Sequence, residues 1–141
     1  LMQHVSTLTF RVEQADRVIE IEARSRESGK PDGPGSAYAL QLRYLTDGLR
    51  LSAKTDAGLA DLERFGVDLL QFRLPGTAHC ELKGADGRIR LHRPSAGADV
   101  VLDLECRDRS LPNQVRVSGV AVAPADIQRL QAWCRDLTRR H

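Results

Sequence analysis

The sequence predicts an α+β fold in which a curved antiparallel meander sheet of about eight strands is covered by two helices, in the order ββββαββββα. Two observations carry this prediction. Apolar and polar residues alternate in short segments along both halves of the chain, which is the period of strands with one buried face. Two further segments, 59–70 and 124–137, repeat their apolar residues at helical spacing. Because strands with one apolar face need a cover, we expect both helices on the concave face of the sheet.

The first half is expected to contain four strands and one helix. A loop rich in Gly and Pro, Glu27–Ser36, separates the second strand from the third, and Asp47-Gly48 is a hairpin turn signal. Thr55 or Asp56 is expected to cap the helix, which ends at Pro75-Gly76. The predicted strands centre on residues 8–12, 19–23, 38–44 and 49–53.

The second half repeats this plan, with strands near 78–82, 89–91, 100–106 and 115–122. Gly119 is expected to form a bulge, and Pro124 opens the last helix. If Gly84–Gly87 is a four-residue loop, His79 lies directly across from His92, whereas a two-residue Asp86-Gly87 turn would place His92 opposite Glu81. We therefore expect a single domain over residues 2–141, beginning at the only methionine, with two similar halves over about 6–71 and 76–138.

Charge and composition narrow the function. The formal net charge is +2, and acids and bases are mixed along the chain without a basic stripe, so we expect no nucleic-acid partner. No apolar run is long enough to span a bilayer, and the start lacks a signal-peptide pattern. The three cysteines lack Cys-x-x-Cys spacing, which fits neither a disulfide framework nor a zinc ribbon. A soluble, cytoplasmic protein with no membrane association is the expectation.

No catalytic or metal-binding signature is present. Cys80, Cys106 and Cys134 fall on predicted apolar faces, where a free cysteine behaves as a small hydrophobe. His79 and His92 could approach a shared metal, but a catalytic zinc needs a third protein ligand. We therefore predict no enzyme activity and no cofactor or metal, and expect another protein as the partner.

Acidic residues follow one predicted strand on its outward face. The candidate partner-binding residues are Asp99, Val101, Asp103, Glu105 and Asp108. An acidic ladder would complement the basic clefts of toxins that cut nucleic acid and would speed encounter. The alternative is that these acids pair with basic residues of their own and neighbouring strands, namely Arg90, Arg107 and Arg116.

The chain from Asp56 onward resembles a protein family. The matching stretches are Ala57-Gly58-Leu59-Ala60-Asp61-Leu62, Gly76-Thr77-Ala78, Gly97–Leu102, Val115–Val120 and Pro124–Leu130. This plan of a helix, a Gly-Thr-Ala step into a strand, three more strands and a final helix resembles the small immunity proteins of bacterial polymorphic and contact-dependent toxin systems, of the wall-associated-protein immunity type. The resemblance implies binding and neutralisation of a cognate toxin without a cofactor. The alternatives are an accessory or scaffolding domain, and a small-ligand binder that uses the curved sheet.

Overall fold

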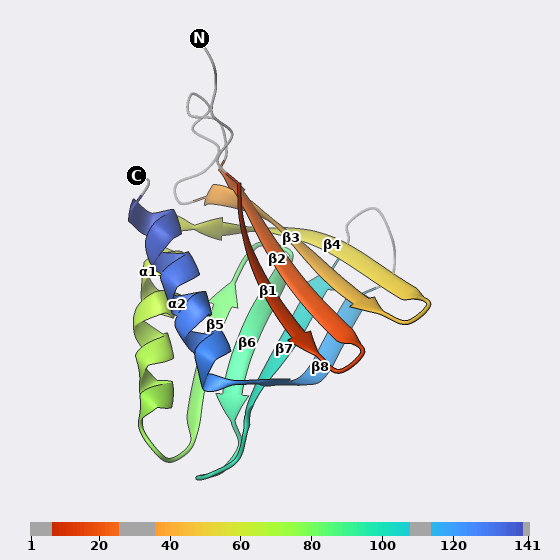
Figure 1. The fold of residues 1–141 in the computed structure, drawn as a ribbon. Helices are drawn as coiled ribbons and strands as arrows, with labels where there is room; N and C mark the ends of the chain where they lie inside the picture. The colour runs from red at the N-terminus through yellow and green to blue at the C-terminus, as the bar shows by residue number, and fades with distance from the viewer. Residues whose placement is uncertain (1–6, 26–35, 108–113, 140–141) are drawn as a thin grey trace.

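The structure is a computed structural model that describes residues 7–25, 36–107 and 114–139 (Figure 1). The predicted loop Glu27–Ser36 lies outside these residues except for Ser36, with which a strand begins, and Asp108 also lies outside them. The described elements follow the order ββββαββββα, with a short 3-10 helix, η1, after the first α-helix. Their bounds are β1 Thr7–Gln14, β2 Arg17–Ser25, β3 Ser36–Thr46, β4 Leu49–Gly58, α1 Leu59–Asp68, η1 Leu69–Arg73, β5 Ala78–Lys83, β6 Gly87–Arg93, β7 Val100–Arg107, β8 Gln114–Val122 and α2 Pro124–Arg139.

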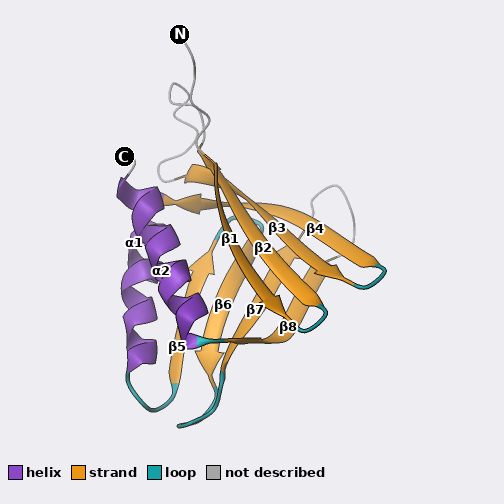
Figure 2. Ribbon diagram, viewed as in Figure 1, coloured by secondary structure: helices purple, strands orange, loops and turns teal. Residues whose placement is uncertain are grey.

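The strands form two antiparallel sheets, each of four strands in sequential order. The first sheet is β1-β2-β3-β4 and the second is β5-β6-β7-β8, so each half is its own meander. The predicted fold class and element order are confirmed, but the strands are divided between two sheets instead of continuing as one. In Figure 2 the two sheets cross, and the helices lie side by side along one flank of both. The helices therefore close the side of the space between the sheets.

The strand registers follow the alternation in the sequence. Lys83 pairs with Arg88, and His79 pairs with His92, as a four-residue turn requires. Opposite β7 the register shifts, because Leu102 pairs with Val120 whereas Leu104 pairs with Val117. Gly119 takes a φ of 76° at this shift, so the predicted bulge is confirmed.

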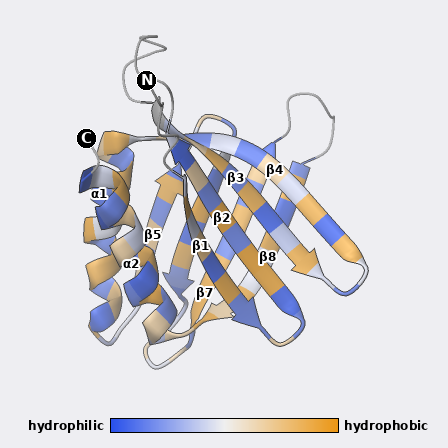
Figure 3. Cartoon of the chain, turned by 45° about the horizontal axis from the view of Figure 1, so that its top comes forward, coloured by the Kyte–Doolittle hydropathy of each residue, from blue (hydrophilic) through white to orange (hydrophobic). Residues whose placement is uncertain are grey.

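The core is built from the inward faces of both sheets and the facing stripes of the helices. Figure 3 shows hydrophobic and hydrophilic residues alternating along the strands. Two polar groups anchor α2 inside this core. The Tyr38 hydroxyl donates to the Leu137 carbonyl at 2.7 Å, and Trp133 Nε1 donates to the Leu8 carbonyl at 3.1 Å. Tyr38 and Trp133 thus combine a large apolar contact with a satisfied hydrogen bond.

Thr55 and Asp56 do not cap the first helix, contrary to the prediction. Strand β4 continues through both residues, and α1 begins after Gly58 without a side-chain cap. Their side chains instead accept hydrogen bonds from the β5–β6 turn: Ala85 N donates to Asp56 Oδ1 at 2.7 Å, and Asp86 N donates to Thr55 Oγ1 at 3.1 Å. Both side chains accept backbone amides, as helix-capping residues do, but these amides belong to a turn of the other sheet and not to α1.

The helices follow the predicted apolar stripes except at Leu70. Leu62, Phe65 and Leu69 are buried, whereas Leu70 is exposed. After Asp68 the chain tightens into η1, and three residues per turn place Leu70 away from the core.

Among the described helices, none is long and apolar enough to cross a membrane.

Gly84 is required where the β5–β6 turn meets β4. A Cβ at this position would lie well inside van der Waals contact of the Asp56 carbonyl oxygen and Thr55 Oγ1. We predict that Gly84→Ala lowers the free energy of unfolding by about 1–3 kcal/mol, the usual effect of forcing an extra carbon into a packed site. Denaturant unfolding measures this loss. Ala85→Ser, one residue later at an exposed position, is the control and should change stability little; equal stability of both variants would contradict the close approach.

Candidate partner-binding face

The predicted partner-binding residues centre on strand β7, in the middle of the second sheet. Val101, Asp103 and Glu105 alternate with buried residues of this strand and point outward. Asp99 is exposed in the loop that precedes the strand, and Asp108 lies outside the described residues. The structure therefore brings Val101, Asp103 and Glu105 onto one face and places Asp99 beyond the end of that row.

Asp103 is held by three neighbours. Its Oδ2 accepts a hydrogen bond from Arg90 at 3.2 Å and lies 3.1 Å from His92 Nε2. Its Oδ1 accepts the backbone N–H of Gly119 at 3.0 Å. One carboxylate oxygen therefore accepts a hydrogen bond from the bulge of β8, and the other contacts the basic side chains of β6.

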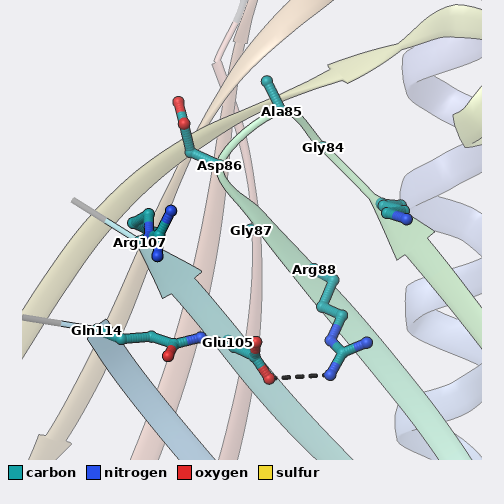
Figure 4. A pocket seen from close by; sticks show the side chains of 9 residues that line it. Gly84, Ala85, Asp86, Gly87, Arg88, Glu105, Arg107 and Gln114 are labelled. Atoms are coloured by element: carbon teal, nitrogen blue, oxygen red, sulfur yellow. Dashed lines mark hydrogen bonds and ion pairs between the residues drawn. The ribbon is translucent and has the colours of Figure 1, made fainter. Parts of the chain in front are cut away.

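Glu105 is the centre of a second set of contacts, which Figure 4 shows in part. Arg88 and Arg116, from the two flanking strands, donate to Glu105 Oε2 at 2.9 and 3.1 Å. The Gln114 amide donates to Oε1 at 2.6 Å. The hydrogen bonds from Arg116 and Arg88 hold the pKa of Glu105 below its ordinary value, and Glu105 raises the pKa of Arg88.

The two carboxylates are thus paired with bases instead of forming a free acidic ladder. Arg90 and Arg116 make the pairings considered from the sequence, and Arg88 adds one that was not predicted. The outward positions of this face carry more basic than acidic residues. The bases are Lys83, Arg88, Arg90, Arg107 and Arg116, and the acids are Glu81, Asp103 and Glu105. The face therefore combines ordered ion pairs with a basic excess.

A depression of about 630 Å³ lies at the end of this face, beside the β5–β6 turn (Figure 4). Residues 84–87 of the turn form one wall, and the side chains around it are Lys83, Arg88, Glu105, Arg107 and Gln114. A smaller hollow of about 210 Å³ is lined by residues of both charges and by two neutral ones: Arg88, Arg90, Asp103, Leu104, Glu105, Arg116 and Ser118. Sequence reasoning missed both hollows, because each is made by residues from different strands.

In the described part of the chain, the two histidines are not part of a larger group of metal-binding side chains. His79 and His92 are cross-strand neighbours, and His92 contacts Asp103. Among the described residues, no group of three or more His, Cys, Asp or Glu side chains could hold a metal ion.

The three cysteines lie in the core, as their positions on apolar faces predict. Burial raises the pKa of Cys80 to about 12, and burial also raises the pKa of Cys134. The Cys106 thiol donates to the Lys54 carbonyl at 3.0 Å. A buried thiol with a raised pKa has little thiolate and is a poor nucleophile.

We predict that all three cysteines react slowly with a thiol reagent in the folded protein at mildly alkaline pH, and fast after unfolding in denaturant. All three thiols are buried, and the raised pKa values of Cys80 and Cys134 leave these two little thiolate. Mass spectrometry of the labelled chain counts the modified thiols over time. Immediate labelling of one cysteine in the folded state would contradict its burial.

The lowered pKa of Glu105 predicts a pH-dependent contribution to stability. A carboxyl group with a lower pKa in the folded state stabilises above its unfolded pKa, and this contribution is lost as the pH falls through the folded value. Glu105→Gln should therefore destabilise the protein more near neutral pH than below pH ~4. Urea unfolding of both proteins at the two pH values measures the difference. A stability difference independent of pH would contradict this role.

Comparisons with known proteins show similarity in fold. No family model matches the chain, and no curated protein sequence matches it. Among solved structures, that of the plant transcriptional regulator PBF-2 is similar, with a TM-score of 0.54. The two share 10% sequence identity, over 94% of this chain and 81% of the other. At this identity the similarity shows a shared arrangement of strands and helices.

Proposed function

We propose that this chain is a non-catalytic protein-binding domain of bacterial origin, an immunity-type inhibitor that neutralises a cognate toxin in the cytoplasm. The outer face of β5–β8 is the proposed contact surface. Asp103 and Glu105 act there together with the arginines that hold them, and Val101 contributes apolar area beside them. Asp99 extends the surface at the start of β7.

The observation that carries this proposal is the fixed arrangement of charges on an open sheet face. Arg88, Arg90 and Arg116 are each hydrogen-bonded to a carboxylate of β7. Side chains that are ordered before binding lose less conformational entropy when a partner arrives. Alternating charges in fixed positions favour one complementary partner surface and penalise others.

The element order supports the immunity-type assignment. The resemblance from Asp56 onward implies a helix, four strands and a final helix, and the described chain has α1, β5–β8 and α2 in that order. The Gly76-Thr77-Ala78 step leads into β5, which begins at Ala78. A binding role also requires no active-site geometry, and it uses the face that the helices leave open.

A charge reversal on the proposed face tests the function. Arg116 has a side chain that is 66% exposed and pairs with Glu105, so Arg116→Glu should leave the fold intact, because exposed ion pairs contribute little to stability. We expect this variant to weaken binding to the toxin encoded by the adjacent gene by at least about tenfold, since removing a well-placed interface charge costs on the order of 1.4 kcal/mol or more. Calorimetry or surface plasmon resonance measures the affinity, and a toxin-activity assay measures neutralisation.

Arg24→Glu is the matched control on the other sheet. The Arg24 side chain is 62% exposed and lies 3.9 Å from Glu22, so the two substitutions change similarly exposed arginines that each lie beside a glutamate. Arg24→Glu should bind as the wild type does. Equal affinity of all three proteins, with intact thermal unfolding, would exclude the face of β5–β8. Loss of binding only in Arg24→Glu would assign binding to the first sheet.

A second candidate, nucleic-acid binding, is favoured by the basic excess on the same face. Because a plant transcriptional regulator has a similar fold, the corresponding hypothesis is that this chain acts in transcription. Phosphate contacts from Lys83, Arg107 and Arg116 would make such binding strongly dependent on salt. Fluorescence anisotropy with labelled single- and double-stranded oligonucleotides separates the candidates: tight, salt-sensitive binding that Arg116→Glu weakens would favour nucleic acid.

A further inference from the structure

Exposed large apolar side chains gather at one place in the described part of the chain. Val67, Leu70 and Leu74 are 64%, 40% and 68% exposed, and they lie close together in sequence: near the end of α1, in η1 and directly after η1. Leu49, at the β3–β4 hairpin, is the other large apolar side chain among the described residues with comparable exposure, at 48%. Clustered apolar exposure marks an interaction surface more often than scattered exposure does.

A groove of about 450 Å³ runs between the two helices beside this cluster. Its walls come from Leu62, Gly66, Val67 and Leu70 on one side and from Gln131, Cys134 and Thr138 on the other. The helices approach closely at its base, because a Cβ on Gly66 would lie 3.3 Å from the Cys134 Cβ. The same surface therefore carries a hollow and, at its rim, apolar side chains that could fill such a hollow.

The groove also carries one acid and one base. Glu63 lines it from α1 and Arg135 from α2, and neither side chain makes a hydrogen bond or ion pair with the described residues. The helices are antiparallel, since Gly66 lies beside Cys134 whereas Arg73, later in the chain, donates to the earlier Gln131 (Figure 1). At a rise of 1.5 Å per residue, Glu63 and Arg135 lie at heights that differ by about 3 Å.

We propose that this surface, the α1–α2 groove, binds a second copy of the chain in a two-fold symmetric dimer. A two-fold axis parallel to the helices places α1 of each copy over α2 of the other, so that every neighbouring helix is antiparallel, as in a four-helix bundle. Val67 and Leu70 of one copy then pack over Gly66 and Cys134 of the other.

The charges of the groove favour a second copy over an unrelated helix. A two-fold operation brings each patch against itself, so an interface between copies must be self-complementary. With the axis parallel to the helices, heights are preserved, and Glu63 of each copy faces Arg135 of the other within reach of both side chains. Two equivalent ion pairs thus flank the apolar contact. The dimer leaves the outer face of β5–β8 open, so the inference does not depend on the proposed function.

Sedimentation velocity and light scattering of the full chain over a range of concentrations test the dimer. The wild type should reach twice the chain mass of 15.6 kDa. Val67→Asp should raise the dimer dissociation constant by at least about 30-fold, the effect of losing one buried interface contact. Leu49→Asp is the control at an exposed apolar residue away from the helices and should remain dimeric. A wild type that stays monomeric at the highest attainable concentration would overturn the proposal.

Two charge reversals test the symmetry of the interface. Glu63→Arg and Arg135→Glu should each weaken self-association, because each places like charges opposite one another. An equimolar mixture of the two variants should form a heterodimer: at one site the introduced arginine faces the introduced glutamate, and at the other the native Glu63 faces the native Arg135. Thermal unfolding confirms that both variants fold. A mixture that remains monomeric while the wild type dimerises would exclude this pairing and the proposed axis.

Discussion

The close contact between the β5–β6 turn and strand β4 constrains how the second sheet packs against the first. Gly84 lets the turn backbone approach the Asp56 carbonyl and the Thr55 side chain, and both β4 side chains accept amides of the turn. Asp56 lies two residues before the end of β4, and α1 follows directly. The contact therefore fixes the second sheet against the first at the place where the chain passes from one half into the other.

Much of the local structure could be predicted from the sequence, because period-two alternation and turn residues act over short distances. The bulge at Gly119 was predicted from neighbouring residues, and the His79–His92 register is the one that a four-residue β5–β6 turn requires. The division into two sheets could not be predicted in this way, since alternation identifies the buried face of a strand and not the strand that packs opposite it. The same holds for Thr55 and Asp56. The sequence indicates that their side chains accept backbone amides, but it does not indicate that these amides come from a distant turn.

The candidate face shows why charge patterning along the chain is a weak guide to charge patterning on a sheet. Asp103 and Glu105 are close in sequence and suggest an acidic ladder. Their basic neighbours, Arg88, Arg90 and Arg116, lie on other strands and reach them only after the sheet forms. The chain has a net charge of only +2, and the basic excess of this face arises from the way the strands pair. It is therefore not visible as a basic stripe along the sequence.

Asp103 and Glu105 have different physical roles despite their adjacent outward positions. Asp103 accepts the Gly119 amide, so its carboxylate stabilises the bulge that restores the inward alternation of β8. Replacing it would alter the backbone of the face as well as its charge, and a loss of binding would not separate the two effects. The contacts of Glu105 are all with side chains, and its arginine partners retain considerable exposure. Replacing Glu105 therefore changes the charge of the face without removing a backbone contact, which makes it the cleaner of the two positions at which to test the proposed binding.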